Sequence, residues 1–387
     1  MKTHPRIYLD NAATTPLDPE VAAVMKEVMD RCFGNPSSTH AFGREARTLV
    51  ERARKTMAEL MGCSPGEICF TSGGTEADNM ILRTVVRAGQ VRKIITSPLE
   101  HHAVLHTVEE LHEKDGVEVV FLPTDTEGRP DLNFLEKELH HDGNRTLVSL
   151  MHANNEIGTM INLAEVGYLA RQHGAHFHSD TVQTVGHYSL TFKDLPLDFA
   201  AASAHKFHGP KGVGFAYLRG GKACGPLITG GAQERNLRAG TENVYGIVGM
   251  AKALELALSA RADHENHIRS LKNRALEKIR ENIPEAEFNG DISEDSLYTV
   301  LNVLLPEFPD PDMLLFRLDI EGLAVSGGSA CSSGSHKGSH VIRALGKSSQ
   351  RPSVRLSFSR MNTMEEVDCA VDILARVVHN APQPHFS

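Results

Sequence analysis

A lysine placed just after a predicted strand is the clearest chemical feature of the sequence. Residues 197–203 form an apolar run typical of a short buried strand, and Lys206 follows before a glycine-rich turn and a second predicted strand, 213–218. A partly desolvated amine loses its proton more readily and can form a Schiff base with an aldehyde. The alternative is an ordinary loop lysine in solvent, so the interpretation depends on partners elsewhere in the chain.

A glycine-containing turn could bind an anionic group. The stretch Ser72-Gly-Gly-Thr-Glu-Ala-Asp78 directly follows predicted strand 68–71 and opens predicted helix 75–87. Free N–H groups at a helix start favour an anion, Gly74 permits close backbone approach, and Thr75 adds a hydroxyl. The stretch matches neither a P-loop nor a dinucleotide fingerprint. It predicts a phosphate site, with a tight strand–helix turn as the alternative.

Polar residues also follow three other predicted strands. Asp180 lies at the carboxyl end of a strand, where it could pair with a protonated pyridine nitrogen such as that of pyridoxal phosphate, with Gln183 donating to the phenolic oxygen. His101 could stack on a flat cofactor and shuttle protons, and the amide of Asn155 could fix a cofactor oxygen. Together they favour Lys206 as the cofactor anchor. The alternatives are a helix-capping aspartate and a solvated loop histidine.

Two further residues could act on a substrate. Cys331 lies in a Ser/Gly-rich loop, about residues 326–339, next to His336 and Lys337, whose charges favour the reactive thiolate. Arg355, in a predicted strand, could form a bidentate pair with a substrate carboxylate. An inert linker cysteine and a surface salt bridge are the alternatives.

The elements that must position these residues indicate an α/β protein. Strands and helices alternate between residues 68 and 218, which implies a mostly parallel sheet covered by helices on both faces. A long amphipathic stretch, about 244–279, then leads to a smaller α+β region. We expect a large cofactor-binding domain of residues 15–259, and a small domain of residues 1–14 with 260–387 that carries the mobile cysteine loop.

Length, charge and cysteine content narrow the class of protein. The chain of 387 residues is longer than one core usually supports, and its net charge of −9 argues against a nucleic-acid-binding surface. No signal pattern opens it, and no apolar run approaches the ~18–20 residues of a spanning helix. Six cysteines without a Cys-x-x-Cys pair favour a reducing cytoplasm over disulfides or structural zinc. His176 and His178 could be a metal pair, but no third ligand is evident nearby, so we expect no metal.

The ordered set of motifs resembles the cysteine desulfurases (NifS/IscS-like), which are pyridoxal-phosphate enzymes of the class V aminotransferase family with the aspartate-aminotransferase fold (fold type I). The resemblance spans nearly the whole chain. The motifs are Leu9-Asp-Asn-Ala-Ala-Thr-Thr-Pro16, Phe70-Thr-Ser-Gly-Gly-Thr-Glu-Ala-Asp-Asn79, Glu100-His-His-Ala-Val-Leu105, Asn154-Asn-Glu-Ile-Gly158, Ser203-Ala-His-Lys206, Arg238-Ala-Gly-Thr-Glu-Asn243 and Ser329-Ala-Cys-Ser-Ser333.

This resemblance implies roles for the residues around the cofactor. Lys206 would hold pyridoxal phosphate, His101 would stack on its ring and act in acid–base steps, and Asp180 would pair with the pyridine nitrogen. Asn155 and Gln183 would flank the substrate and the phenolic oxygen. The phosphate would be bound by Gly74, Thr75, Ser203, His205 and, from the other subunit of a homodimer, Thr241.

The resemblance also implies the reaction. Asn11 and Arg355 would bind the carboxylate of L-cysteine, and Cys331 would accept its sulfur as a persulfide, leaving L-alanine. The sulfur would pass to an acceptor protein for iron–sulfur cluster assembly or tRNA thiolation, in the cytoplasm and without membrane or direct nucleic-acid contacts. Alternatives are a selenocysteine lyase, another aminotransferase-like enzyme of the same cofactor class, or a non-enzymatic scaffold, against which the intact Lys206 argues.

Overall fold

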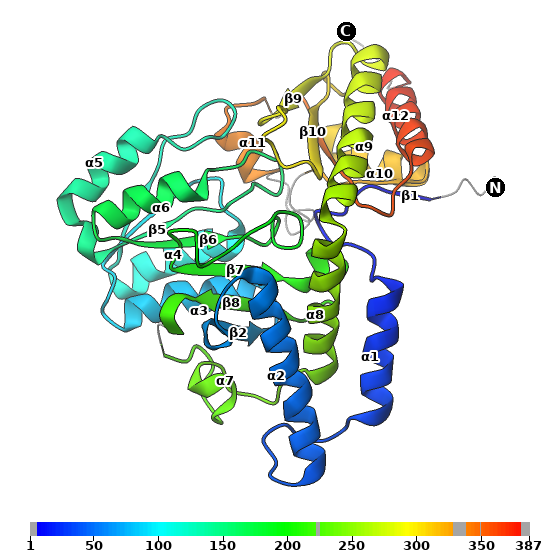
Figure 1. Cartoon of the computed structure of the whole chain (residues 1–387). Helices are drawn as coiled ribbons and strands as arrows, with labels where there is room; N and C mark the ends of the chain where they lie inside the picture. Colours follow the sequence, from blue (N-terminus) through cyan, green and yellow to red (C-terminus); the bar gives the residue numbers. More distant parts are fainter. Residues whose placement is uncertain (1–5, 222–224, 328–337, 349, 381–387) are drawn as a thin grey trace.

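A seven-stranded sheet forms the centre of the larger part of the protein in the computed structural model, which describes residues 6–221, 225–327, 338–348 and 350–380 (Figure 1). The strand order is β2-β8-β7-β6-β5-β3-β4, and only β8 is antiparallel to its neighbours. The mostly parallel sheet predicted from the sequence is therefore confirmed, with one reversed strand. The strands are β2 (Ile68–Thr71), β3 (Lys93–Thr96), β4 (Glu118–Phe121), β5 (Thr146–Ser149), β6 (His176–Asp180), β7 (Phe199–Ser203) and β8 (Gly214–Leu218).

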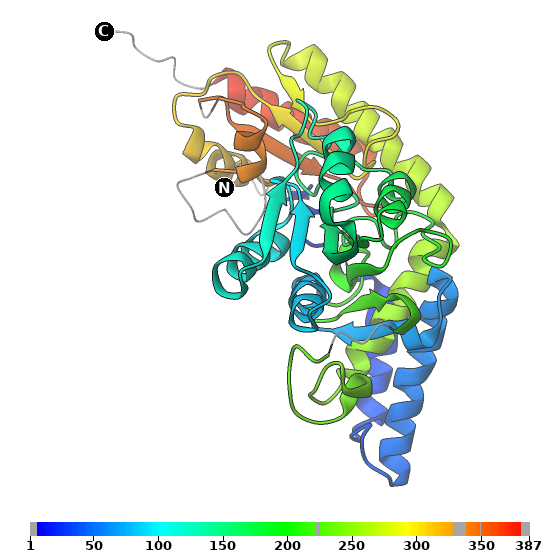
Figure 2. The ribbon, with the colours of Figure 1, turned by 90° about the vertical axis from the view of Figure 1, so that its left-hand side faces the viewer.

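Helices cover both faces of this sheet, because successive strand residues point to opposite sides. Phe70 packs in a core with α2, α5, α6 and α8, whereas its neighbour Cys69 packs in a second core with α3 and α4. Figures 1 and 2 show α1 and α2 alongside α8. These helices are α1 (Pro19–Arg31), α2 (Ala41–Met61), α3 (Gly74–Arg87), α4 (His102–Asp115), α5 (Leu132–Asp142), α6 (Leu163–Gln172), α7 (Gln233–Asn236) and α8 (Val244–Ser259).

Local sequence signals set several helix ends. The carboxylate of Asp18 accepts a hydrogen bond from the N–H of Glu20 and caps α1, which begins at Pro19. Gly62 ends α2 with a φ of 60°, a conformation that L side chains rarely adopt. Both helix ends therefore depend on residues that are neighbours in the sequence.

The C-terminal part has its own sheet and core, to which the N-terminal segment contributes. Strand β10 pairs antiparallel with β9 and β12, and the short strand β1 pairs in parallel with β11. Helices α9 and α12 lie side by side over this sheet (Figure 1). The elements are β1 (Ile7–Tyr8), α9 (Arg261–Asn282), β9 (Glu287–Asn289), β10 (Val300–Leu304), α10 (Leu314–Ile320), β11 (Leu323–Ala324), α11 (His340–Ala344), β12 (Ser353–Ser357) and α12 (Met364–His379).

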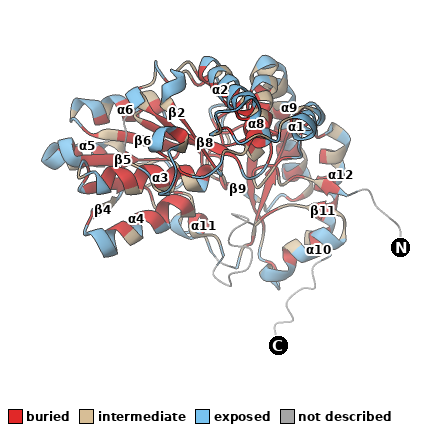
Figure 3. Cartoon of the chain, turned by 90° about the horizontal axis from the view of Figure 1, so that it is seen from below, coloured by how far each residue is buried: buried red, intermediate tan, exposed pale blue. Residues whose placement is uncertain are grey.

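Burial follows this layered arrangement. Figure 3 shows the strands of both sheets mostly buried, while the helices present exposed faces outward. The amphipathic stretch 244–279 is two helices, because the backbone of Ala260 leaves helical geometry between α8 and α9. Among the described residues, no helix is both long and apolar enough to cross a membrane.

Candidate active site

Ten of the thirteen predicted site residues line one cavity at the carboxyl ends of the parallel strands. The cavity, with its open mouth, encloses about 750 Å³. Open α/β sheets bind their ligands at this edge because the loops that follow the strands converge there. The ten are Gly74, Thr75, His101, Asn155, Asp180, Gln183, Ser203, His205, Lys206 and Arg355.

Lys206 ends a single 3-10 turn, Ala204–Lys206, that directly follows strand β7. Its amine donates hydrogen bonds to the carbonyl oxygens of Ala12 (2.5 Å) and Ala13 (2.8 Å) in the N-terminal segment. The side chain is half-buried. The amine therefore faces the cavity from a rigid strand end, held by two neutral acceptors.

The start of α3 provides the predicted anion site. Gly74 is the first residue of the helix, and a Cβ there would lie 2.5 Å from a methyl carbon of Val182, so only glycine fits. Ser203 and His205 lie beside this turn in the cavity wall. Burial, followed by the positive charges of Lys206 and a second lysine, lowers the pKa of His205 to about 4, so its imidazole is neutral at pH 7.

Asp180 ends strand β6, and its carboxylate accepts a hydrogen bond from the N–H of Val182 (2.9 Å). Burial raises the pKa of Asp180 to about 6, although this hydrogen bond and the charge of Lys206 oppose the shift. A protonated pyridine nitrogen beside this carboxylate would supply the charge that stabilises its ionised form. A buried acid, an amine and a glycine-lined helix start in one cavity therefore fit pyridoxal phosphate.

His101 is the N-cap of α4, where its Nδ1 accepts a hydrogen bond from the N–H of Ala103 (3.1 Å). The remaining proton of the neutral ring is therefore on Nε2. Burial, and then the charge of Lys206, lower the pKa of His101 to about 4. The ring is a neutral donor in the cavity wall, which suits stacking on a flat cofactor.

Arg355 projects from β12 into the cavity and is almost wholly buried. Its Nη2 lies 2.7 Å from Oδ1 of Asp10, and its Nη1 donates to the carbonyl of Asn155 (2.8 Å). Its Nε has no hydrogen-bond partner among the described residues. Because a guanidinium has five N–H donors and these contacts use two of them, the unpartnered Nε–H can donate to a substrate carboxylate beside the Asp10 contact.

Two predicted side chains make contacts that the sequence did not indicate. Gln183 donates through Nε2 to the carbonyl of Ala12 (3.1 Å), the same oxygen that Lys206 contacts. Asn11 is buried outside the cavity wall, where its Nδ2 donates to the carbonyl of Ser357 and to Asn362. Its role is therefore to hold the N-terminal segment in this structure.

Two predicted site residues remain, Thr241 and Cys331. Thr241 is exposed and does not line the cavity, and Cys331 lies outside the described residues. The loop before Thr241 is held by Glu234, whose buried carboxylate accepts hydrogen bonds from Arg54 (2.7 and 2.8 Å) and from the N–H of Phe70.

Three buried polar residues that the sequence analysis did not select stand behind Asp180. Nε2 of His178 lies 3.3 Å from Oδ1 of Asp78, and its Nδ1 lies 2.9 Å from Oγ of Ser149. Burial, and then the charges of Asp180 and Glu100, raise the pKa of Asp78 well above its usual range. Asp78 also lines the cavity. The sequence signal that could have identified Asp78 is its position, one turn into the helix that follows the glycine motif.

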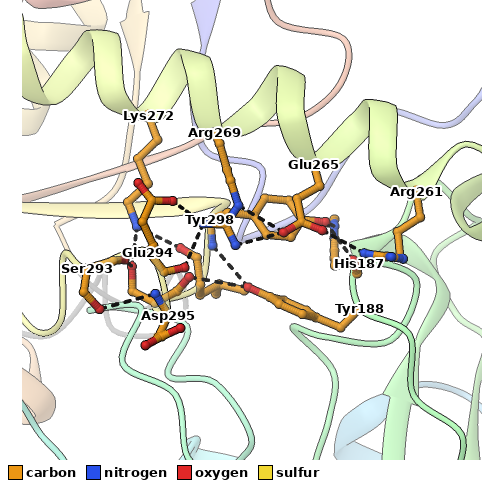
Figure 4. Close-up of polar contacts among 12 residues, drawn as sticks. His187, Tyr188, Arg261, Glu265, Arg269, Lys272, Ser293, Glu294, Asp295 and Tyr298 are labelled. Atoms are coloured by element: carbon orange, nitrogen blue, oxygen red, sulfur yellow. Dashed lines mark hydrogen bonds and ion pairs between the residues drawn. The ribbon is translucent and has the colours of Figure 1, made fainter.

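A polar cluster joins α9 to the segments that carry His187 and Tyr298 (Figure 4), and it contacts the backbone of Lys206. Nε2 of His187 lies 3.1 Å from the carbonyl oxygen of Lys206, and the hydroxyl of Tyr298 donates to the carbonyl of His187 (2.9 Å). Arg269 lies over the ring of Tyr298 and pairs with Glu265. This cluster connects the lysine turn to the C-terminal core.

Comparison with known proteins identifies the family of this chain. The family Aminotransferase class-V matches residues 7–369, and the chain belongs to this family. A "Cysteine desulfurase IscS" of Dictyoglomus turgidum is 43% identical over 376 residues, covering 96% of this chain and 94% of the relative. Within the family, the chain is therefore one of the NifS/IscS-like cysteine desulfurases.

Solved structures show the same relationship. A structure described as "NIFS-LIKE PROTEIN" is 37% identical with a TM-score of 0.88, covering 97% of this chain and 99% of that chain. A second, "SspA in complex with cysteine", is 30% identical with a TM-score of 0.77, covering 92% of this chain and 100% of that chain. Both matches cover more than nine-tenths of this chain, so the fold class predicted from the sequence is confirmed.

Proposed function

We propose that this protein is a pyridoxal-phosphate-dependent cysteine desulfurase that converts L-cysteine to L-alanine and transfers the sulfur to Cys331. The observation that carries the proposal is the meeting of Lys206, Asp180 and Arg355 in one cavity. An amine, a ring-pairing acid and a carboxylate-binding guanidinium are the groups that an amino-acid substrate of this cofactor needs. The cysteine-bound relative supports cysteine as the substrate.

Each residue has a role that follows from its place in the cavity. Pyridoxal phosphate, when bound, supplies an electron-withdrawing ring that stabilises negative charge on the substrate. Asp180 keeps the pyridine nitrogen protonated, Gly74, Thr75, Ser203 and His205 bind the phosphate, and Asn155 and Gln183 orient the ring. Lys206 Nζ anchors the cofactor and takes the proton from the substrate α-carbon. Neutral His101 stacks on the ring and donates from Nε2, while Arg355 binds the substrate carboxylate. Asn11, which lies outside the cavity wall, holds the N-terminal segment in place.

Cys331 completes the sulfur transfer. Its thiolate attacks the substrate sulfur, the new S–S bond forms as the Cβ–S bond breaks, and Cβ keeps the electron pair and takes a proton to give alanine. The loop of residues 326–339 carries the thiol between the cavity and the sulfur acceptor. The acceptor is a protein of iron–sulfur cluster assembly or tRNA thiolation.

The test is to incubate the purified holoenzyme with L-cysteine and measure alanine and protein-bound persulfide. We expect both from the wild type, neither from Lys206→Ala, and loss of the persulfide with at least 10²-fold slower alanine release from Cys331→Ala. Alanine release at the wild-type rate from Cys331→Ala would exclude the sulfur-transfer role. L-selenocysteine as the substrate separates the desulfurase from a selenocysteine lyase.

The active enzyme is proposed to be a homodimer in which Thr241 reaches the phosphate of the other subunit. Its exposure and its absence from the cavity wall of its own chain support this. Mixed dimers of Lys206→Ala and Thr241→Val contain one complete site. They should recover tight cofactor binding and activity that neither parent has, and no recovery would contradict a shared site.

The remaining assignments concern organisation and location. We retain residues 15–259 as the large domain and residues 1–14 with 260–387 as the small domain, in line with the separate core around α9 and α12. Among the described residues, four cysteines are free thiols, namely Cys32, Cys63, Cys69 and Cys369. Free thiols support a cytoplasmic location, because the cytoplasm is reducing. Limited proteolysis and fractionation of the host cell test these two assignments.

A further inference from the structure

Two histidines and a glutamate meet on the outer side of the large domain, away from the cavity. Glu136 and His140 are four residues apart on α5, so both side chains lie on one face of that helix. His173 follows the last residue of α6. One potential metal-ligand atom from each of the three side chains lies within 4.8 Å of the other two. Among the residues that the structure describes, this is the one group of three His, Cys, Asp or Glu side chains placed this closely.

The backbone that carries this group is fixed. A Cβ on Gly143 would lie 2.1 Å from the carbonyl oxygen of His173, so glycine lets the end of α5 touch the end of α6. Leu139 of α5 and Ala170 of α6 are buried in the same core. The two imidazoles are therefore attached to backbones held in contact, and their ring centroids lie 4.5 Å apart at 80°.

The chemistry of the group selects the ion. Imidazole nitrogens suit Zn²⁺ and its late first-row neighbours, whereas Ca²⁺ and Mg²⁺ prefer sites made of oxygens. Three protein ligands leave a tetrahedral position open for water. Glu136 and His140 are exposed and His173 is half-buried, so an ion can reach all three without opening the fold.

We propose that Glu136, His140 and His173 form a binding site for a divalent transition-metal ion of the zinc type that joins α5 to α6. The site lies apart from the cavity that contains Lys206, and none of its residues lines that cavity. It extends the sequence analysis, which expected no metal and considered only His176 and His178. The signal available in the sequence was the four-residue spacing of Glu136 and His140.

The test is titration of the holoenzyme with ZnSO4 by calorimetry, with hydrogen exchange of residues 132–142 and 163–174 as the local readout. His140→Ala/His173→Ala removes both imidazoles, and His141→Ala is the matched control because it removes an exposed neighbour on the same helix. We expect the wild type and control to bind one more Zn²⁺ than the double variant. Zinc should slow exchange in both segments only in those two proteins.

The affinity for Zn²⁺ refines the result. Glu136→Gln should weaken this Zn²⁺ event at least about ten-fold, since even outer-shell partners of a metal contribute that much. Equal stoichiometry in the wild type and the double variant, or zinc-dependent protection that survives in the double variant, would overturn the proposal. Zinc bound by active-site groups would leave exchange in these segments unchanged, and that outcome also overturns it.

Discussion

Nη2 of Arg355 lies 2.7 Å from Oδ1 of Asp10, and the two residues come from opposite ends of the chain. The guanidinium side chain is 1% exposed and the carboxylate 18% exposed, so the pair is largely shielded from water. The pair joins the N-terminal segment to β12 at the cavity wall. It uses one N–H of the guanidinium, whereas the Nε–H has no partner among the described residues and is available to a substrate carboxylate.

Replacing Arg355 with lysine should weaken substrate binding more than turnover. Lysine keeps the charge but loses the planar fork, which costs about 1.5–3 kcal/mol, or roughly a 10- to 100-fold rise in KM for L-cysteine. Steady-state alanine production measures this change. Arg351→Lys is the control because Arg351 pairs with Glu287 outside the cavity. An unchanged KM in Arg355→Lys would remove Arg355 from the substrate site.

Asp78 should behave as a neutral acid. Because its pKa is raised by burial and by Asp180, Asp78→Asn keeps both shape and charge and should change the free energy of unfolding by less than about 1 kcal/mol. Asp78→Ala leaves Nε2 of His178 without its neighbour and should cost about 1–3 kcal/mol. Urea unfolding of both variants decides this. If Asp78→Asn were as damaging as Asp78→Ala, the carboxyl would have to be ionised.

His178 should contribute to the loss of stability in acid. Burial lowers its pKa to about 3, against roughly 6.5 in an unfolded chain. As the pH falls below about 6.5, the unfolded state binds a proton that the folded state does not, and stability decreases by up to about 1.4 kcal/mol per pH unit. Asp78 has the opposite effect on stability, because its carboxyl holds a proton in the folded state that it releases in the unfolded chain.

Substitution separates these opposing effects. Urea unfolding of His178→Gln between pH 6.5 and 5 should show a shallower decrease in stability than the wild type. The double variant with Asp78→Asn should return to the wild-type slope, because the two changes remove opposite proton uptakes. The same slope in wild type and His178→Gln would mean that His178 titrates normally when folded. His141→Gln, an exposed site, is the control.

Glu234 should anchor the loop that leads to Thr241. It forms a buried pair with Arg54 and accepts the N–H of Phe70, while its own φ is 46°. Glu234→Gln leaves a buried guanidinium without its counter-charge and should cost about 3–5 kcal/mol. Glu51→Gln removes the exposed partner of the same arginine and should cost no more than about 1 kcal/mol. Thermal unfolding compares them, and equal losses would contradict the anchoring role.

Much of the fold could be predicted because local patterns agreed with the tertiary structure. Strand β2 has the predicted bounds, and the Asp18 cap and Gly62 stop act through neighbouring residues alone. The sequence does not mark the boundary between α8 and α9, because neither glycine nor proline lies near Ala260, where the backbone leaves helical geometry. It also made no prediction for α5, whose face carries the proposed metal ligands.

The sequence by itself determined the α/β class and ten of the fifteen residues that line the cavity, since most of the motifs follow parallel strands, which end at one sheet edge. Only the tertiary structure decided that Arg355 is paired with Asp10 and that Asp78 stands beside His178. These contacts join segments far apart in the chain. Their distances and burial, and therefore the protonation of the buried acids, depend on packing that no local pattern specifies.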